Sequence, residues 1–137
     1  MGFLGFGDIF YQINYRFDEP IDLYNVFIPL FIDTFAKAGI NLRIERESQY
    51  YIDFKGDHGF YGEINPVGKR CVGDNLYVFT QFYLTVNRSK RSDVSEEQFG
   101  SILMQFYDVL SQHIKMHSFS ATKKGKIWEN IHSPGIE

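Results

Sequence analysis

Residues 8–18 read DIFYQINYRFD, and along this stretch the side chains change character at every position. One face carries only apolar or aromatic residues: Ile9, Tyr11, Ile13, Tyr15 and Phe17. The other face carries Phe10, Gln12, Asn14 and Arg16. A period of two residues is typical of a β-strand with one buried side, so a half-buried strand is predicted here.

The same alternation returns in the middle of the chain. Residues 40–47 and 50–55 both alternate, and only Ser48 and Gln49 separate them, which predicts a tight hairpin. The glycine-rich section after residue 55 predicts turns around a short strand at 60–64. The strongest strand is predicted at 76–87. Its first face carries Leu76, Val78, Phe82, Leu84 and Val86, and its second carries Tyr77, Phe79 and Tyr83. A strand that is apolar on both faces is central in its sheet, or its second face binds something.

Two helical stretches interrupt the strands. The first is predicted from Pro20 to Gly39, and Pro29 in its middle removes an amide donor and should kink or split the helix. The second begins at Ser95, where Gln98 three residues later completes a capping box. Its apolar spacing predicts a helix that runs to about Met116.

This order of elements predicts an α+β fold. We expect an antiparallel sheet of four to six strands with helices packed mainly on one face, in the order β-α-β-β-β-β-α. The length of 137 residues predicts a single domain. The polar, basic segment from about residue 118 is predicted to be a flexible tail, with Trp128 as an anchor onto the body of the protein.

Composition and charge exclude several classes of function. The net charge of −3 disfavours non-specific nucleic-acid binding. The longest apolar run, residues 26–32, is far too short to span a membrane. The lone Cys71 excludes an intrachain disulfide, and this favours a cytoplasmic location. No motif for a cofactor is present, so none is predicted.

One pair of histidines has a spacing that suits a metal. His113 and His117 lie four residues apart on the second predicted helix, so both imidazoles could reach one ion. Metalloproteases require Glu directly after the first His, and here Ile114 stands in that place. The pair also continues the apolar stripe of the helix. We therefore interpret these residues as packed histidines and predict no metal site.

Two other sets of polar residues are candidates for a catalytic or ligand-binding site. The acid-x-Lys sequence at Asp53 and Lys55, with Glu45 or Glu63 as a second acid, fits half of a metal-dependent nuclease or hydrolase site. This is the alternative function, although one such pair is expected by chance in a chain of this composition. The glycine-rich section also holds a set of polar residues that could converge on a ligand or simply form turns: Asp57, His58, Tyr61 and Glu63.

The aromatic content points to binding rather than catalysis. The chain has 14 Phe, 9 Tyr and 1 Trp, which is more than a small core is expected to hide, so some rings should lie on a surface. If the hairpin at 40–55 and the strand at 76–87 share one sheet, tyrosines and carboxylates meet on its uncovered face. Alternatively, a second layer of chain, such as the segment around Trp128, covers these rings and leaves no binding surface.

From this face we predict a non-catalytic protein-binding module. The expected function is an inhibitor or immunity-type protein that covers a partner toxin or enzyme, with a basic toxin as the model partner. The predicted partner-binding residues are Glu45, Glu47, Tyr51, Asp53, Tyr77 and Tyr83.

Overall fold

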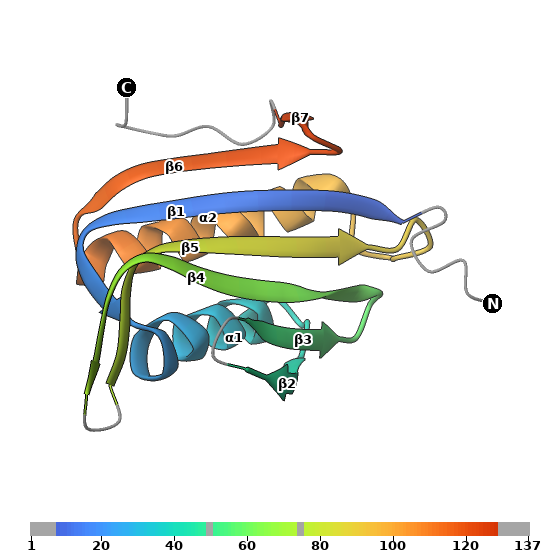
Figure 1. Cartoon of the computed structure of the whole chain (residues 1–137). Coiled ribbons are helices and arrows are strands. Elements are labelled where there is room, and N and C mark those ends of the chain that lie inside the picture. The colour runs from blue at the N-terminus through green and yellow to red at the C-terminus, as the bar shows by residue number, and fades with distance from the viewer. Residues whose placement is uncertain (1–7, 49–50, 74–75, 129–137) are drawn as a thin grey trace.

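The computed structural model describes residues 8–48, 51–73 and 76–128, with side chains throughout except at 68–73, 76 and 77. Seven antiparallel strands within these ranges form one sheet in the order β2-β3-β4-β5-β1-β6-β7, and two helices cover one of its faces (Figure 1). The strands are β1 Ile9–Asp22, β2 Leu42–Glu47, β3 Ile52–Gly56, β4 Phe60–Gly73, β5 Leu76–Arg88, β6 Met116–Lys123 and β7 Lys126–Ile127. The helices are α1 Ile28–Lys37, preceded by a π-helical turn η1 at Leu23–Phe27, and α2 Glu96–His113. The predicted α+β class with an antiparallel sheet is confirmed, but the sheet has seven strands in place of four to six, and the predicted order lacks β6 and β7 after α2.

Strands β1 and β5 form the middle of the sheet. Tyr11 lies opposite Val86 and Ile13 opposite Leu84, so the apolar faces of the two strands coincide. All four side chains are buried beneath the helices, as the alternation in residues 8–18 and 76–87 predicts. Phe10, on the other face of β1, is 41% exposed.

The helical segment after β1 consists of two short pieces, as predicted, but they join directly at Phe27 and Ile28, and Pro29 makes no gap. The turn η1 is capped by Asp22, whose carboxylate accepts hydrogen bonds from the backbone N–H groups of Tyr24 and Asn25. Helix α1 then starts at Ile28, which places Pro29 in its first turn, where the helix needs no N–H donor. The predicted start at Pro20 is wrong, because β1 continues to Asp22.

Helix α2 begins with the predicted capping box. The Ser95 hydroxyl accepts from the N–H of Gln98, and the Gln98 side chain accepts from the N–H of Ser95. The helix ends at His113, because Ile114 is extended and Met116 already belongs to β6. The prediction of a helix to Met116 is therefore wrong.

The segment after residue 118 was predicted to be a flexible tail, and for residues 118–127 this is wrong. Strand β6 pairs with β1 and buries Phe119 and Ala121, and β7 returns along β6. The apolar residues of β6 are few and are separated by polar ones, so the composition of the segment does not reveal a strand. Trp128 is buried as the predicted anchor: its ring centroid lies 4.6 Å from that of Tyr11 and 5.6 Å from that of Phe99.

Most of the aromatic side chains form the core between sheet and helices. The Phe27 ring of η1 stacks on Phe82 of β5, with centroids 4.2 Å apart and planes inclined by 14°. The same ring meets Tyr15 and Phe106 edge-on. Edge and stacked ring pairs add to the free energy gained by burial alone, so the core accounts for much of the unusual composition.

The second face of β5 is less apolar than predicted. Phe79 is 3% exposed and lies edge-on to Phe82 on the helix side, with ring centroids 6.0 Å apart. The register of β5 shifts between Phe79 and Gln81 against both neighbouring strands. A bulge of this kind reverses the alternation, so Phe79 belongs to the core and its predicted place on the uncovered face is wrong.

Neither helix in the described part of the chain is long and apolar enough to cross a membrane.

Candidate functional site

The face of the sheet opposite the helices is the main candidate for function, and we call it the open face. In Figure 1 both helices lie on the far side of the strands, and no described segment covers the near side. Side chains that alternate with buried core residues point to this face: Phe10, Gln12, Asn14, Arg16, Asp53, Lys55, Tyr61, Glu63, Asn65, Gln81, Tyr83, Thr85 and Asn87. The open face is thus a mixture of rings, amides and charges.

The centre of the open face is held by side-chain amides. Gln81 Nε2 donates to Asn14 Oδ1 at 3.0 Å and to the Tyr83 hydroxyl at 3.1 Å. Tyr83 and Asn14 lie directly opposite each other on β5 and β1. Both accept from Gln81, and this shared donor holds the Tyr83 ring at the surface, where it is half-buried.

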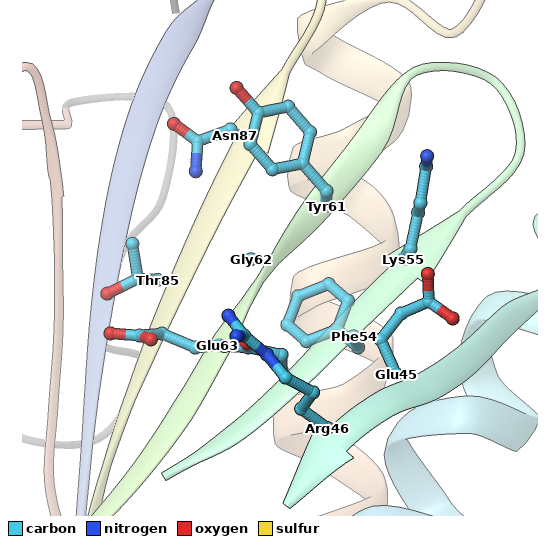
Figure 2. Close-up of a pocket in the computed structure, with 10 residues that line it drawn as sticks. Glu45, Arg46, Phe54, Lys55, Tyr61, Gly62, Glu63, Thr85 and Asn87 are labelled. Carbon is cyan, nitrogen blue, oxygen red and sulfur yellow. The ribbon is translucent and has the colours of Figure 1, made fainter. Parts of the chain in front are cut away.

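A groove of about 850 Å³ opens on this face over strands β2 to β5 (Figure 2). Its lining consists of Glu45, Arg46, Asp53, Phe54, Lys55, Tyr61, Gly62, Glu63, Thr85 and Asn87. Gly62 and Phe54 lie opposite each other at the floor of the groove, and a Cβ at Gly62 would overlap the carbonyl oxygen of Thr85 and lie only 3.0 Å from the Phe54 ring. The Phe54 ring itself is 3% exposed and packs edge-on against Phe31, so it lies beneath the floor on the helix side of the sheet.

One wall of the groove carries an ion pair. Arg46 donates from Nε at 3.0 Å and from Nη2 at 2.9 Å to the same oxygen, Oδ2, of Asp53. Arg46 occupies this position because Glu45 is an extra residue in the pairing of β2 with β3, so that Arg46 lies opposite Asp53. Asp53 and the nearby Tyr51 raise the pKa of the exposed Arg46 guanidinium.

Glu63 is the most unusual group in the groove. It lies directly opposite Asp53 on the neighbouring strand, so two carboxyl groups face each other. Burial raises the pKa of Glu63, and the charge of Asp53 and a hydrogen bond to it raise it further. Within the described ranges no ion pair joins Glu63 to a basic side chain.

Tyr61 and Lys55 lie at the other end of the groove. The Tyr61 hydroxyl donates to Asp8 Oδ2 at 2.7 Å, and burial followed by this bond raises the pKa of Tyr61 to about 12. The Lys55 side chain extends away from Glu63 toward the opposite side of the groove (Figure 2). Lys55 therefore does not neutralise Glu63.

The structure brings together part of the predicted partner-binding set. Asp53 and Tyr83 lie on the open face, Glu45 lines the groove, and Tyr51 lies close enough to influence Arg46. Glu47 is misplaced in the prediction. It pairs with the buried Ile52, so its side chain is on the helix side of the edge strand, because the bulge at Glu45 reverses the alternation. The side chain of Tyr77 lies outside the described residues.

The acid-x-Lys residues also meet in this groove. Asp53, Lys55, Glu45 and Glu63 all line it, which keeps the alternative hypothesis of a catalytic site open. In the described residues, however, no three His, Cys, Asp or Glu side chains are grouped so that they could hold a metal ion.

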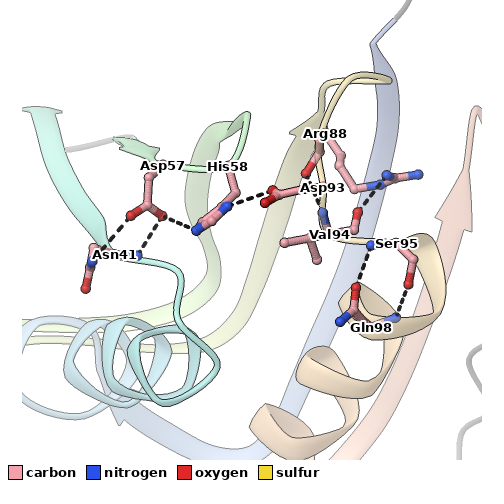
Figure 3. A network of polar contacts seen from close by, with 9 residues as sticks. Asn41, Asp57, His58, Arg88, Asp93, Val94, Ser95 and Gln98 are labelled. Atoms are coloured by element: carbon pink, nitrogen blue, oxygen red, sulfur yellow. Dashed lines mark hydrogen bonds and ion pairs between the residues drawn. The ribbon is translucent and has the colours of Figure 1, made fainter.

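The polar residues of the glycine-rich section divide between two places. Tyr61 and Glu63 line the groove, whereas Asp57 and His58 belong to the β3–β4 turn and form the network in Figure 3. Asp57 accepts from the N–H of Asn41 at 2.9 Å, and His58 Nδ1 lies 2.8 Å from Asp93 Oδ1. His58 and Gly59 both have positive φ, as a two-residue type I′ turn requires. This network joins three loops.

The two histidines four residues apart do not share a helix. His113 ends α2, and His117 lies on β6, where its Nδ1 is 3.0 Å from Asp18 Oδ1. Both are exposed, so the interpretation as packed histidines is wrong as well.

Sequence reasoning missed Arg46, Thr85 and Asn87 as groove residues. Thr85 and Asn87 lie on the open face of β5 by simple alternation. They can be recognised as groove residues only when the pairing of β4 with β5 is known. Arg46 becomes visible only once the bulge at Glu45 is known. In comparisons with known proteins, neither a protein-family model nor a curated protein matches this sequence.

Proposed function

We propose that this protein is a non-catalytic binding module that inhibits a partner protein by docking it on the open face. The observation that carries the proposal is the position of Tyr83. Its ring is half-buried at the centre of a sheet face that no described segment covers, and it is held there by Gln81. Interface cores favour tyrosine, which contributes a large contact area with little loss of side-chain entropy.

The groove supports the same function. It places carboxylates in the same hollow as Tyr61, and charged groups around apolar contacts speed association and select the partner. Immunity-type inhibition of a basic toxin or enzyme is the form of binding that best suits this surface.

Affinity capture from the native host tests the proposal. The wild-type protein and a Tyr83→Ala variant serve as baits, and mass spectrometry identifies proteins that only the wild type retains. The captured protein is then purified, and its activity is measured with and without each bait. Inhibition by the wild type that weakens at least about tenfold in Tyr83→Ala is the expected result.

Ile127→Ala is the matched control, because Ile127 is 82% exposed and lies on the edge strand β7, outside the open face. A partner that both variants bind equally well would refute docking through the open face.

A metal-dependent nuclease or hydrolase is the second candidate, and the shared location of Asp53, Lys55 and Glu63 in one groove favours it. This function requires cleavage of nucleic acid that depends on Mg²⁺ and disappears in Lys55→Ala. Such activity in the purified protein would reverse the order of the two candidates.

A further inference from the structure

The charges in the groove are incompletely compensated. Arg46 gives two hydrogen bonds to Asp53, so that carboxylate has its counter-ion. Glu63 faces the same carboxylate and is partly removed from water, and the described part of the chain supplies it with no basic partner. An ionised carboxyl group in this position lowers the stability of the fold. Proteins tolerate such a loss of stability most readily at functional sites, where a bound ligand compensates the charge.

The shape of the groove restricts what that ligand can be. No side chain stands on the floor at Gly62, whereas Glu63 and the Thr85 side chain lie together at one wall (Figure 2). An occupant should therefore have a slender stem and a cationic end. An arginine side chain has both, and its planar head donates several hydrogen bonds at once.

We propose that the groove receives an arginine side chain of the partner protein, with the guanidinium group against Glu63 and the aliphatic stem over the strand at Gly62. This inference rests on the proposed function, because it identifies the feature of the partner that the open face recognises. A basic partner supplies such a side chain, and its charge complements the carboxyl groups of the groove.

A divalent metal ion is a poorer occupant of the same place. Asp53 already accepts two hydrogen bonds from a guanidinium group, and that positive charge repels a second cation at Asp53. Mg²⁺ also requires near-octahedral oxygen coordination, whereas an arginine needs only the carboxyl group of Glu63 and a neighbouring acceptor.

The first test uses the protein alone. N-acetyl-arginine amide is titrated into ¹⁵N-labelled protein and followed by NMR, with the neutral analogue N-acetyl-citrulline amide in parallel. Saturable shifts of the backbone amides of Glu63 and Thr85 are expected for the arginine compound only. Glu63→Gln should weaken this binding at least tenfold, whereas Glu19→Gln, a change at an exposed acid of β1, should leave it intact.

Three results would overturn the inference: equal shifts with citrulline, unchanged binding in Glu63→Gln, or saturation of the same amides by MgCl₂ in place of the arginine compound.

The second test uses the captured partner and separates the two proposals. If Tyr83→Ala weakens the complex while Glu63→Gln leaves its off-rate unchanged, the open face binds the partner and the arginine inference is wrong. If the arginine compound binds but no captured partner depends on Tyr83, the proposed function is wrong. If both variants raise the off-rate at least tenfold, and an arginine of the partner is the residue whose change to Ala abolishes the Glu63 effect, both proposals hold.

Discussion

The hydroxyl group of Tyr11 lies 2.7 Å from Oε1 of Glu96, and this contact joins the middle of the sheet to the first turn of α2. The bond is one of several. Lys123 Nζ lies 2.7 Å from the same Glu96 oxygen, and Arg88 Nε donates to the Tyr11 hydroxyl at 3.3 Å. Burial would raise the pKa of Glu96, but its hydrogen bonds from Lys123 and Tyr11 lower it overall. The network therefore connects β1, β5, β6 and α2 through charged and neutral groups.

Removing the Tyr11 hydroxyl should destabilise the protein. Burial, followed by the bond to Glu96, raises the pKa of Tyr11 to about 12, so the hydroxyl stays a donor at neutral pH. Tyr11→Phe loses that bond and leaves the buried Arg88 Nε without its acceptor, at a cost of about 1–3 kcal/mol. Urea denaturation measures the change in the free energy of unfolding.

Tyr15→Phe is the matched control. The Tyr15 hydroxyl is fully buried and has no hydrogen-bond partner among the described residues, and burial raises its pKa. Its removal should leave stability unchanged or increase it. Equal losses in the two variants would mean that the Tyr11 network contributes nothing specific.

Trp128 should be essential for the stability of the fold. Its side chain is 3% exposed and packs on the Tyr11 and Phe99 rings. Trp128→Ala should lower the free energy of unfolding by about 3–5 kcal/mol, because it leaves a large cavity. The neighbouring Ile127→Ala should change it by no more than about 0.5 kcal/mol. Thermal melts of both variants measure the difference: the melting temperature should fall strongly for Trp128→Ala and stay nearly unchanged for Ile127→Ala.

Glu63→Gln should stabilise the protein at neutral pH. The raised pKa of Glu63 means that the folded state holds its proton more tightly than the unfolded state. The contribution of Glu63 to stability is therefore most favourable below the ordinary pKa of a glutamate and declines as pH rises through the folded value. The gain from the amide should be larger at pH 7 than at pH 4, as shown by melting temperatures across this range.

Glu19→Gln is again the control. If Glu63→Gln gives an equal gain at both pH values, the destabilisation does not come from ionisation of Glu63.

The pH dependence of the loop network should come from His58. A hydrogen bond to Asp93 is the main cause that raises the pKa of His58, and the same bond lowers the pKa of Asp93. The stabilisation from His58 is complete below the unfolded histidine value of about 6.5 and is lost as pH rises through the folded value. The stabilisation from Asp93 is lost as pH falls through its lowered value, so the pair stabilises the protein most in the mildly acidic range.

NMR titration of the His58 ring checks this relationship. Asp93→Asn should lower the pKa of His58, whereas Asp108→Asn, at an exposed position on α2, should not. A His58 titration that Asp93→Asn does not alter would show that the pair does not form in solution.

The hydrophobic alternation of residues 8–18 and the capping box at Ser95 predicted β1 and the start of α2, because both signals are local. The bulges at Glu45 and near Phe79 were not predictable in this way. A bulge is visible only in the register against a neighbouring strand. Residues before and after a bulge follow opposite alternations, so a prediction that ignores the bulge places one group on the wrong side of the sheet. Glu47 and Phe79 were misplaced for this reason.

The candidate site could be predicted only in outline. Asp53 and Tyr83 reached the open face because their strands alternate regularly at those positions. The groove itself combines residues from β2, β3, β4 and β5, so its lining appears only where these strands come together. The contact between Arg46 and Asp53 depends in turn on the bulge at Glu45.

The position of β1 in the sheet has a consequence for the kinetics of folding. Its partners are β5 and β6, so Tyr11 pairs with Val86 on one side and with Lys123 on the other. During synthesis β1 leaves the ribosome well before β5 and β6. Until they follow, neither edge of β1 has a strand to pair with. Chains dominated by such distant pairings fold slowly, on a scale of milliseconds to seconds. Assembly of the sheet must therefore wait for the last third of the chain, and the nascent protein depends on protection from aggregation until β6 is made.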